Sequence, residues 1–244
     1  MRQKLINIHI PKTAGTTLRA TLAECVQRAH DGKYRVLGID PHNDGGSPFE
    51  GLKLEARRRL PEIKNPGLQV MSGHYRYRDI AEVIADHRDH VSLVTFVRDP
   101  MWRTISDYHY CISDRHPTRD HFVGMYPQFG DYLKSAYETS KQLEYLRPFE
   151  GASVSQTVEN AVANIDFVGV TEHFDDDVRT LLSAAGIAYV SRDPFNVHPD
   201  RSELERTYEK YHDQMQEALE YELDLYRAIL EYRDQSAWPH RTVS

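Results

Sequence analysis

The sequence predicts an α/β fold in which a central parallel sheet is flanked by helices, and three observations point to it. Five short apolar or β-branched runs recur along the 244 residues. Helical periodicity fills most of the intervals between them. Hydrophobic residues make up 40% of the chain, which is enough to bury a core without an external staple. Strands that alternate with helices pair in parallel and carry helices on both faces, so we expect three layers.

The predicted elements follow one another in this alternating order. The strand-like runs are Leu5–Ile10, Tyr34–Ile39, Leu68–Met71, Val91–Val97 and Phe167–Val170. After the first run, apolar side chains recur at helical spacing at Leu18, Leu22, Cys25, Val26 and Ala29. Further helical patterns cover Ile80–Ala85 and Val178–Ala185. Strand and helix therefore alternate over the front two thirds of the chain.

Three segments depart from this alternation. Turn-forming residues fill Asp40–Pro48, which we expect to be an exposed loop. The pattern loosens from Cys111 to about Gly151 and resembles an insertion over one end of the sheet. The segment Leu204–Tyr232 is predicted to be one long charged helix with a solvated surface. Because no internal repeat or low-complexity linker appears, we expect residues 1–244 to form a single domain with an insertion at about 111–151.

The charge distribution is asymmetric. The net charge is −7, but residues 1–110 hold 17 basic against 13 acidic residues, whereas residues 111–244 hold 13 against 24. The front half suits an anionic ligand, and a chain this acidic argues against general nucleic-acid binding. No apolar run approaches the roughly 20 residues that span a bilayer, and the N-terminus shows no signal-peptide pattern, so we expect no integral membrane association and a cytoplasmic location.

Cysteine and histidine spacing gives no metal or disulfide signal. Cys25 lies on the apolar stripe of the first predicted helix and is interpreted as a buried thiol, and Cys111 is the one other cysteine. No C-x-x-C or zinc spacing occurs. His87 and His90 lack a third ligand as a metal pair. We therefore expect a site without metal.

The segment His9–Thr17 reads H-I-P-K-T-A-G-T-T and joins the first predicted strand to the first predicted helix. The N–H groups in the first turn of a helix point one way and form an anion site, so we expect a phosphate or sulfate there. Lys12 stands at the start of this turn, whereas the Walker pattern G-x-x-x-x-G-K-[ST] places its lysine directly before the final hydroxyl residue. The turn is therefore an anion loop that fails the Walker pattern.

A second strand–helix junction follows Val91–Val97. Asp99 is a suitable N-cap and Pro100 a suitable first helical residue, so a helix begins at once. Arg98 then stands at the carboxyl end of the strand, and Ser106 follows about two turns into the helix. This spacing allows a guanidinium and a hydroxyl to close on one further phosphate. The alternative is an ordinary junction with a surface arginine.

Two motifs, H-I-P-K-T-A-G-T-T at His9–Thr17 and R-D-P-M-W-R-T-I-S at Arg98–Ser106, resemble a known family. They are similar to those of the sulfotransferases that use 3′-phosphoadenosine 5′-phosphosulfate (PAPS), particularly the group that includes the heparan-sulfate 2-O-sulfotransferases. The resemblance extends to Phe167–Phe174 and Asp224–Tyr226 and is thin from Cys111 to Gly151. It implies a P-loop-like three-layer fold and PAPS as sulfuryl donor.

The resemblance also implies roles for individual residues. Arg98 and Ser106 correspond to the pair that holds the 3′-phosphate in the family. The first turn corresponds to the loop that holds the 5′-phosphosulfate, which here comprises Lys12, Thr13, Ala14, Gly15, Thr16 and Thr17.

Transfer of a sulfuryl group by in-line displacement needs a cation at the leaving phosphate oxygen and a base for the acceptor hydroxyl. Lys12 is the predicted cation. His74 is the predicted base, because it follows a strand and lies at the same sheet edge as both anion sites. The family resemblance implies the same role, although its members often carry a second histidine where this chain has Ser72. We interpret His9, inside the first strand, as a packed side chain rather than a catalyst.

The acceptor is expected to be a hydroxyl of a carbohydrate or another small molecule. The segment 111–151 is rich in aromatic and polar side chains without a sustained period, which suits ligand recognition. Tyr75 and Arg76 follow the predicted base, and Arg115 lies in the segment, so these three are candidate acceptor contacts. The alternative is that the aromatic side chains pack the segment onto the sheet.

Two other functions compete with this interpretation. A P-loop kinase for nucleosides or small molecules would use ATP and magnesium, but the displaced lysine and the missing G-K-[ST] argue against it. A non-catalytic nucleotide-binding module would keep both pockets without the chemistry.

Overall fold

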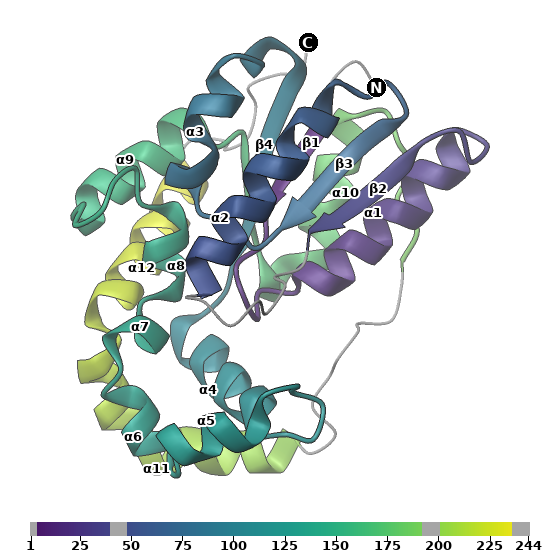
Figure 1. Cartoon of the computed structure of the whole chain (residues 1–244). Coiled ribbons are helices and arrows are strands. Elements are labelled where there is room, and N and C mark those ends of the chain that lie inside the picture. The colour runs from purple at the N-terminus through teal and green to yellow at the C-terminus, as the bar shows by residue number, and fades with distance from the viewer. Residues whose placement is uncertain (1–3, 40–47, 192–200, 236–244) are drawn as a thin grey trace.

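A computed structural model describes residues 4–39, 48–191 and 201–235, and it confirms the predicted α/β fold (Figure 1). One parallel sheet has the strand order β2-β3-β1-β4-β5. Its strands are β1 Lys4–Ile8, β2 Arg35–Ile39, β3 Leu68–Gly73, β4 Val91–Val97 and β5 Phe167–Val170. All five predicted runs are therefore strands, with ends that move by up to two residues. The first strand stops at Ile8, so His9 and Ile10 belong to the connection that follows it.

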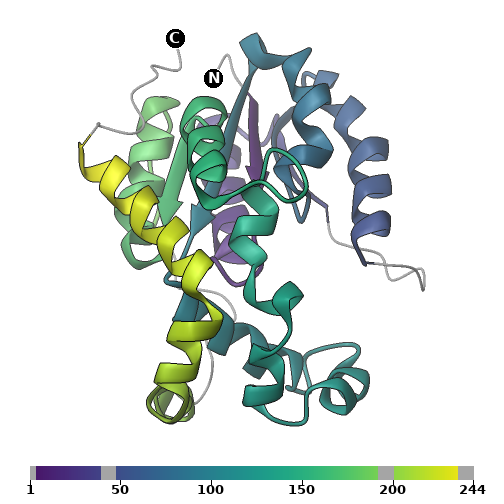
Figure 2. The same ribbon diagram turned by 90° about the vertical axis from the view of Figure 1, so that its left-hand side faces the viewer.

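Helices cover both faces of the sheet and one end of it (Figures 1 and 2). They are α1 Gly15–Ala29, α2 Pro48–Arg59, α3 Tyr77–Ala85, α4 Pro100–Cys111, α5 Arg119–Met125, α6 Phe129–Leu133, α7 Ala136–Thr139, α8 Lys141–Leu146, α9 Val154–Asn164, α10 Phe174–Ala184, α11 Arg201–Ala218 and α12 Glu220–Gln235. Short 3₁₀ turns occupy η1 Leu60–Lys64, η2 Arg88–His90 and η3 Thr171–His173.

The strand side chains alternate between two cores, because successive residues of a strand point to opposite faces. Ile6 and Ile8 are fully buried in the core beneath α2, α3, α8, α9 and α12. Leu5 belongs to the opposite core, beneath α1 and α10. Burial on both faces explains why the strands read as continuous apolar runs in the sequence.

A third apolar cluster lies beyond the carboxyl ends of the strands. It joins α4, α5, α6 and α11, and its members include Ile105, Tyr132 and Met215. In Figure 1 the strands point toward these helices, so the cluster forms a helical layer at one end of the sheet. The loops that leave the strands therefore face this layer.

The predicted single helix over Leu204–Tyr232 is wrong in one respect, because the chain forms two helices that part at Leu219. Met215 and Leu219 are buried in the third cluster, whereas Leu225 and Ile229 are buried in the sheet core. One straight helix cannot reach both cores, so the axis turns between them, as Figure 2 shows. The charged surface hid this division in the sequence.

The predicted junction at the end of β4 is confirmed. The backbone N–H of Trp102 donates to Oδ1 of Asp99 at 3.0 Å, so Asp99 caps α4 with Pro100 as its first residue. Almost all of the turn-rich segment Asp40–Pro48 lies outside the described residues. Among the helices in the described ranges, none has the length and apolar character needed to cross a bilayer.

Candidate active site

The connection between β1 and α1 is tightly curled. Lys12 and Ala14 both have positive φ values, 67° and 60°, which non-glycine residues rarely adopt. Between them, both the backbone N–H and the hydroxyl of Thr13 donate to the carbonyl oxygen of Ile10, at 3.4 and 2.9 Å. Backbone strain of this kind persists where the surrounding structure imposes it, and it is concentrated at functional sites. The turn is therefore a preformed concave loop.

The N-terminus of α1 continues this loop. Its N-cap is Ala14, which has no side-chain acceptor to offer, and the first intrahelical bond runs from the N–H of Leu18 to the carbonyl of Ala14 at 2.9 Å. The helix is 15 residues long, so its dipole adds to the field of the first-turn N–H groups. The loop and the helix start together have the features of the anion site that the sequence predicts, and the assignment stays a prediction.

The side chain of Lys12 reaches α4. Its ammonium nitrogen lies 4.2 Å from the centroid of the Tyr110 ring. Burial lowers the pKa of Lys12, and the positive charges of Arg98 and Arg115 lower it further, while Asp107 opposes them. A cation that is partly removed from water interacts strongly with an anion. Lys12 is thus placed to act on a negatively charged group at the loop.

Arg98 connects the two motifs that the sequence singled out. Its Nη1 donates to the backbone oxygen of Lys12 at 3.2 Å, so the end of β4 contacts the anion loop directly. Burial lowers the pKa of Arg98, and Glu172 partly offsets this effect. Ser106 is half-buried on α4, two turns after the junction. Three adjacent strands, β3, β1 and β4, therefore deliver His74, Lys12 and Arg98 to one edge of the sheet.

His74 has a neighbour that the sequence did not identify. It follows β3, and its ring stacks on the ring of His9 with centroids 4.1 Å apart and planes inclined by 26°. The His9 N–H donates to the carbonyl of Gly73 at 2.8 Å, which fixes the two segments side by side. Burial is the main cause that lowers the pKa of His9 well below its usual value, and His74 adds to it. The site therefore contains a pair of imidazoles.

Ser72, which stands where related enzymes often have a second histidine, points away from this pair. It is buried inside the sheet, and its hydroxyl accepts a hydrogen bond from Nδ2 of Asn7 at 2.8 Å. His9 supplies a second imidazole beside His74 from the connection that follows β1.

Gly15 allows His9 to lie where it does. A Cβ on Gly15 would stand 1.8 Å from Cδ2 of the His9 ring, which is far inside van der Waals contact. The ring therefore rests against the backbone at the start of α1. Glycine is required here by close approach and by no unusual φ value.

The three candidate acceptor contacts lie in different environments. Tyr75 is 1% exposed, and its hydroxyl donates to the carbonyl of Met71 at 3.3 Å, so it packs in the core. Arg76 is half-buried and forms an ion pair with Asp79, with Nε and Oδ2 2.7 Å apart. Arg115 is exposed and lies close enough to Lys12 to affect its pKa. Of the three, Arg115 faces both solvent and the loop.

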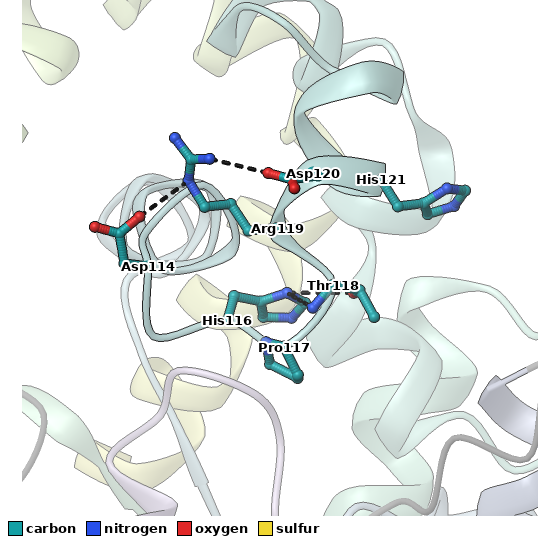
Figure 3. A pocket seen from close by; sticks show the side chains of 7 residues that line it. All are labelled: Asp114, His116, Pro117, Thr118, Arg119, Asp120 and His121. Atoms are coloured by element: carbon teal, nitrogen blue, oxygen red, sulfur yellow. Dashed lines mark hydrogen bonds and ion pairs between the residues drawn. The ribbon is translucent and has the colours of Figure 1, made fainter.

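The segment 111–151 folds into the short helices α5 to α8. Several of its aromatic side chains are buried, as the packing alternative expects: Phe122, Phe129, Tyr132 and Tyr145. At its start, Asp114 and residues 116–121 line an open pocket of about 500 Å³ (Figure 3). Figure 3 shows the guanidinium of Arg119 between Asp114 and Asp120, and the ring of His116 next to Thr118. Arg119 forms ion pairs with Asp114 and Asp120, at 3.4 and 3.0 Å.

The residues that support the backbone of Arg98 were not predicted from the sequence. Its N–H donates to Oε1 of Gln142 at 2.8 Å, and Nε2 of Gln142 donates to its carbonyl at 3.0 Å. Gln142 is supported in turn by Glu222, which accepts its backbone N–H at 3.2 Å. These contacts join segments about 44 and 80 residues apart, so no local pattern could have identified them.

No metal cluster accompanies the site. Within the described ranges, no group of three or more histidine, cysteine, aspartate or glutamate side chains could hold an ion. Both cysteines, Cys25 and Cys111, are buried and free.

Comparison with known proteins adds independent findings. The family model described as "Sulfotransferase family" matches residues 1–232. No curated protein sequence matches the chain. Among solved structures, the chain is similar to mouse sulfotransferase SULT7A1 complexed with PAP, with 16% identity and a TM-score of 0.41 over 86% of this chain and 63% of that one. It is also similar to the sulfotransferase from Alicyclobacillus acidocaldarius, with 17% identity and a TM-score of 0.44 over 93% and 99% of the two chains. The chain thus spans less than two thirds of the mouse protein.

The matched range contains every element of the sheet and both anion-site motifs. The chain therefore belongs to the sulfotransferase family, whose members are enzymes that transfer sulfuryl groups.

Proposed function

We propose that this enzyme takes its sulfuryl group from PAPS and transfers it to a hydroxyl of a carbohydrate or another small molecule by in-line displacement. One observation carries the proposal: the carboxyl ends of β3, β1 and β4 bring His74, Lys12 and Arg98 to the same edge of the sheet. Ligands of open α/β sheets bind at this edge.

The donor set fits a nucleotide that carries two separated anionic groups. The loop from Lys12 to Thr17 offers backbone N–H groups and a cation for one of them. Arg98 and Ser106 supply a guanidinium and a hydroxyl for the other. Bound there, the donor supplies an activated sulfuryl group on a phosphate oxygen.

Three protein groups then have distinct tasks. His74 accepts the proton of the acceptor hydroxyl on an imidazole nitrogen as the new oxygen–sulfur bond forms. Lys12 stabilises the negative charge on the phosphate oxygen from which the sulfuryl group departs. His9 packs against His74 and limits the orientations of its ring.

The acceptor would enter from the side of segment 111–151. The open pocket at residues 114–121 and the exposed Arg115 support this location, since both lie near the lysine end of the site. Arg76 is a weaker candidate because Asp79 already pairs with it. Tyr75 would contribute by holding the strand end in place. The cytoplasmic location expected from the sequence stays a prediction.

The first test combines binding and turnover in a His74→Ala variant. We expect it to bind 3′-phosphoadenosine 5′-phosphate (PAP) normally by calorimetry, yet to transfer sulfate about 10²–10⁴ times more slowly, the usual contribution of a positioned base. The wild-type protein should show no comparable affinity for ATP with magnesium.

Three results would contradict the proposal. Near-full activity of the His74→Ala variant would move the base to another residue. Preferential binding of ATP with magnesium would favour the kinase alternative. PAP binding by the wild type without any sulfate transfer, across a panel of hydroxyl acceptors, would favour a non-catalytic module.

A further inference from the structure

We propose that Tyr110 is a positioning residue for Lys12, and that its ring fixes the lysine ammonium over the last turn of α4. This inference rests on the proposed function, in which Lys12 acts on the leaving phosphate oxygen. Tyr110 lies outside the anion-loop motif and has no role in the proposed function described above.

The contact itself is direct. The ammonium nitrogen of Lys12 lies 4.2 Å from the centroid of the Tyr110 ring, well within the 6 Å or so over which an aromatic face attracts a cation. Such contacts are stronger where the cation is partly desolvated, and Lys12 is half-buried. The attraction comes from the ring face, so a phenylalanine would preserve it and an aliphatic side chain would not.

The backbone of Lys12 is fixed as well. Its φ of 67° is part of the curled loop, and its carbonyl oxygen accepts a hydrogen bond from Arg98 at 3.2 Å. A long flexible side chain would still leave the ammonium free to sample many rotamers. Tyr110 restrains that end, so both ends of Lys12 are held.

Tyr110 is itself held in place. Its ring meets the His116 ring edge to face, with centroids 5.3 Å apart and planes at 86°. Its carbonyl oxygen accepts hydrogen bonds from the N–H and hydroxyl of Ser113, at 3.1 and 2.7 Å. The ring therefore offers Lys12 a fixed surface, and His116 links that surface to the open pocket at residues 114–121.

The position of Tyr110 on α4 agrees with this role. Tyr110 follows Ser106 by four residues, so the two side chains lie on the same helix face, about 6 Å apart along the axis. One face of α4 therefore carries a residue for each of the two proposed anion sites. The last turn of a helix also favours a positive charge. The charged or titratable groups around Lys12 include Asp107 and Cys111 on α4, together with Arg98, Arg115, His9 and His116.

Three variants separate the ring face from other features of the side chain: Tyr110→Phe, Tyr110→Leu and Tyr110→Met. We expect Tyr110→Phe to retain kcat within about twofold, because the ring remains. Tyr110→Leu and Tyr110→Met should each lower kcat by about tenfold, the order expected from a partly buried cation–ring contact. Affinity for PAP should change less than kcat, since the restraint acts on the lysine at the reacting bond. Thermal unfolding identifies any variant that fails to fold, and the methionine variant keeps the bulk of the site filled.

A second measurement does not depend on sulfate transfer. Protons near the ammonium of Lys12 lie over a ring face, so their nuclear magnetic resonance signals should be shifted upfield. A Lys12→Ala variant assigns these signals. The shift should persist in Tyr110→Phe, vanish in Tyr110→Leu, and be unaffected in the control Tyr221→Leu, which removes an exposed tyrosine of α12.

The two measurements together show whether Tyr110 positions Lys12. Loss of the upfield shift in Tyr110→Leu together with a selective fall in kcat supports the inference. Equal activity of the phenylalanine and leucine variants, whether both high or both low, would overturn it. If the wild type transferred no sulfate from PAPS, the proposed function would fail while the resonance shift still reported on the contact.

Discussion

At the scale of single residues, the stacked pair of His9 and His74 changes how the site is understood. The sequence suggested that His9 is a packed side chain, and it does pack, but against the predicted base and against Gly15. Two imidazoles 4.1 Å apart disfavour each other's protonation, because their positive charges would repel. Burial lowers the pKa of His9, and the charge of His74 lowers it further, so His9 is the member of the pair that the fold keeps neutral.

This arrangement predicts a dependence of folding stability on pH. Burial and neighbouring positive charge lower the pKa of His9 in the folded protein. Above pH 6.5 the residue is neutral in both states; below it, the unfolded chain takes up a proton that the folded chain does not. The wild-type protein should therefore lose stability relative to a His9→Phe variant as the pH falls from 7.5 to 5.5, by up to about 1.4 kcal/mol.

Urea unfolding of both proteins at the two pH values measures this difference. The exposed His90, changed to glutamine, serves as the control, for which the difference should not vary. If the difference in unfolding free energy between wild type and His9→Phe were the same at both pH values, His9 would bind a proton as readily in the folded protein as in the unfolded chain.

At the scale of elements, α12 and α8 support Arg98, the residue proposed to form the second anion site. Glu222 of α12 is buried and accepts the backbone N–H groups of Gln142 and Leu143 at the start of α8, at 3.2 and 2.7 Å. The side chain of Gln142 in turn accepts a hydrogen bond from the N–H of Arg98 and donates one to its carbonyl oxygen. The C-terminal helix thereby fixes a residue at the end of β4.

Replacing Glu222 with alanine should weaken both the fold and the site. Two buried N–H groups would lose their acceptor, which costs about 1–3 kcal/mol each, so we expect the unfolding free energy to fall by about 2–6 kcal/mol. PAP affinity should decrease as well, because Arg98 loses its support.

Chemical denaturation and calorimetry measure the two effects. Glu220→Ala is the matched control, since Glu220 is exposed at the first position of the same helix. Unchanged PAP affinity in a folded Glu222→Ala protein would separate α12 from the donor site.

The elements also show what a sequence can and cannot predict. The β4–α4 junction was predictable because a capping aspartate and a proline act locally, and the structure has the Asp99 cap. The division at Leu219 was not, because Met215 and Leu219 pack in one core whereas Leu225 and Ile229 pack in another. The short helices α5 to α8 depend on tertiary packing in the same way. In the candidate site, the loop and strand-end residues could be proposed from the sequence. The contacts of His9, Tyr110 and Gln142 could not, because they form only in the folded structure.

At the scale of the whole molecule, donor binding should stabilise the fold as a unit, because its proposed contacts come from loops on adjacent strands. PAP at about 100 times its dissociation constant should add about 2.7 kcal/mol. For a chain of this length that corresponds to a rise in Tm of roughly 5–10 °C.

Differential scanning calorimetry with PAP and with adenosine 5′-phosphate tests this prediction. The wild type should respond more strongly to PAP, and Arg98→Ala should lose that preference, because its guanidinium is assigned to the 3′-phosphate. An Arg98→Ala protein that still distinguishes the two nucleotides would refute the assignment of the second anion site.

The support that α12 gives to Arg98 has a consequence for the order in which the protein matures on the ribosome. Glu222 lies 125 residues after Val97, the last residue of β4. At synthesis rates of about 5–20 residues per second, the end of β4 exists for roughly 6–25 s before Glu222 is made. During that interval the growing chain can begin to assemble its sheet, but Arg98 lacks the Gln142–Glu222 support. Full donor affinity should therefore be acquired late, and a nascent chain stalled before α12 should bind nucleotide weakly.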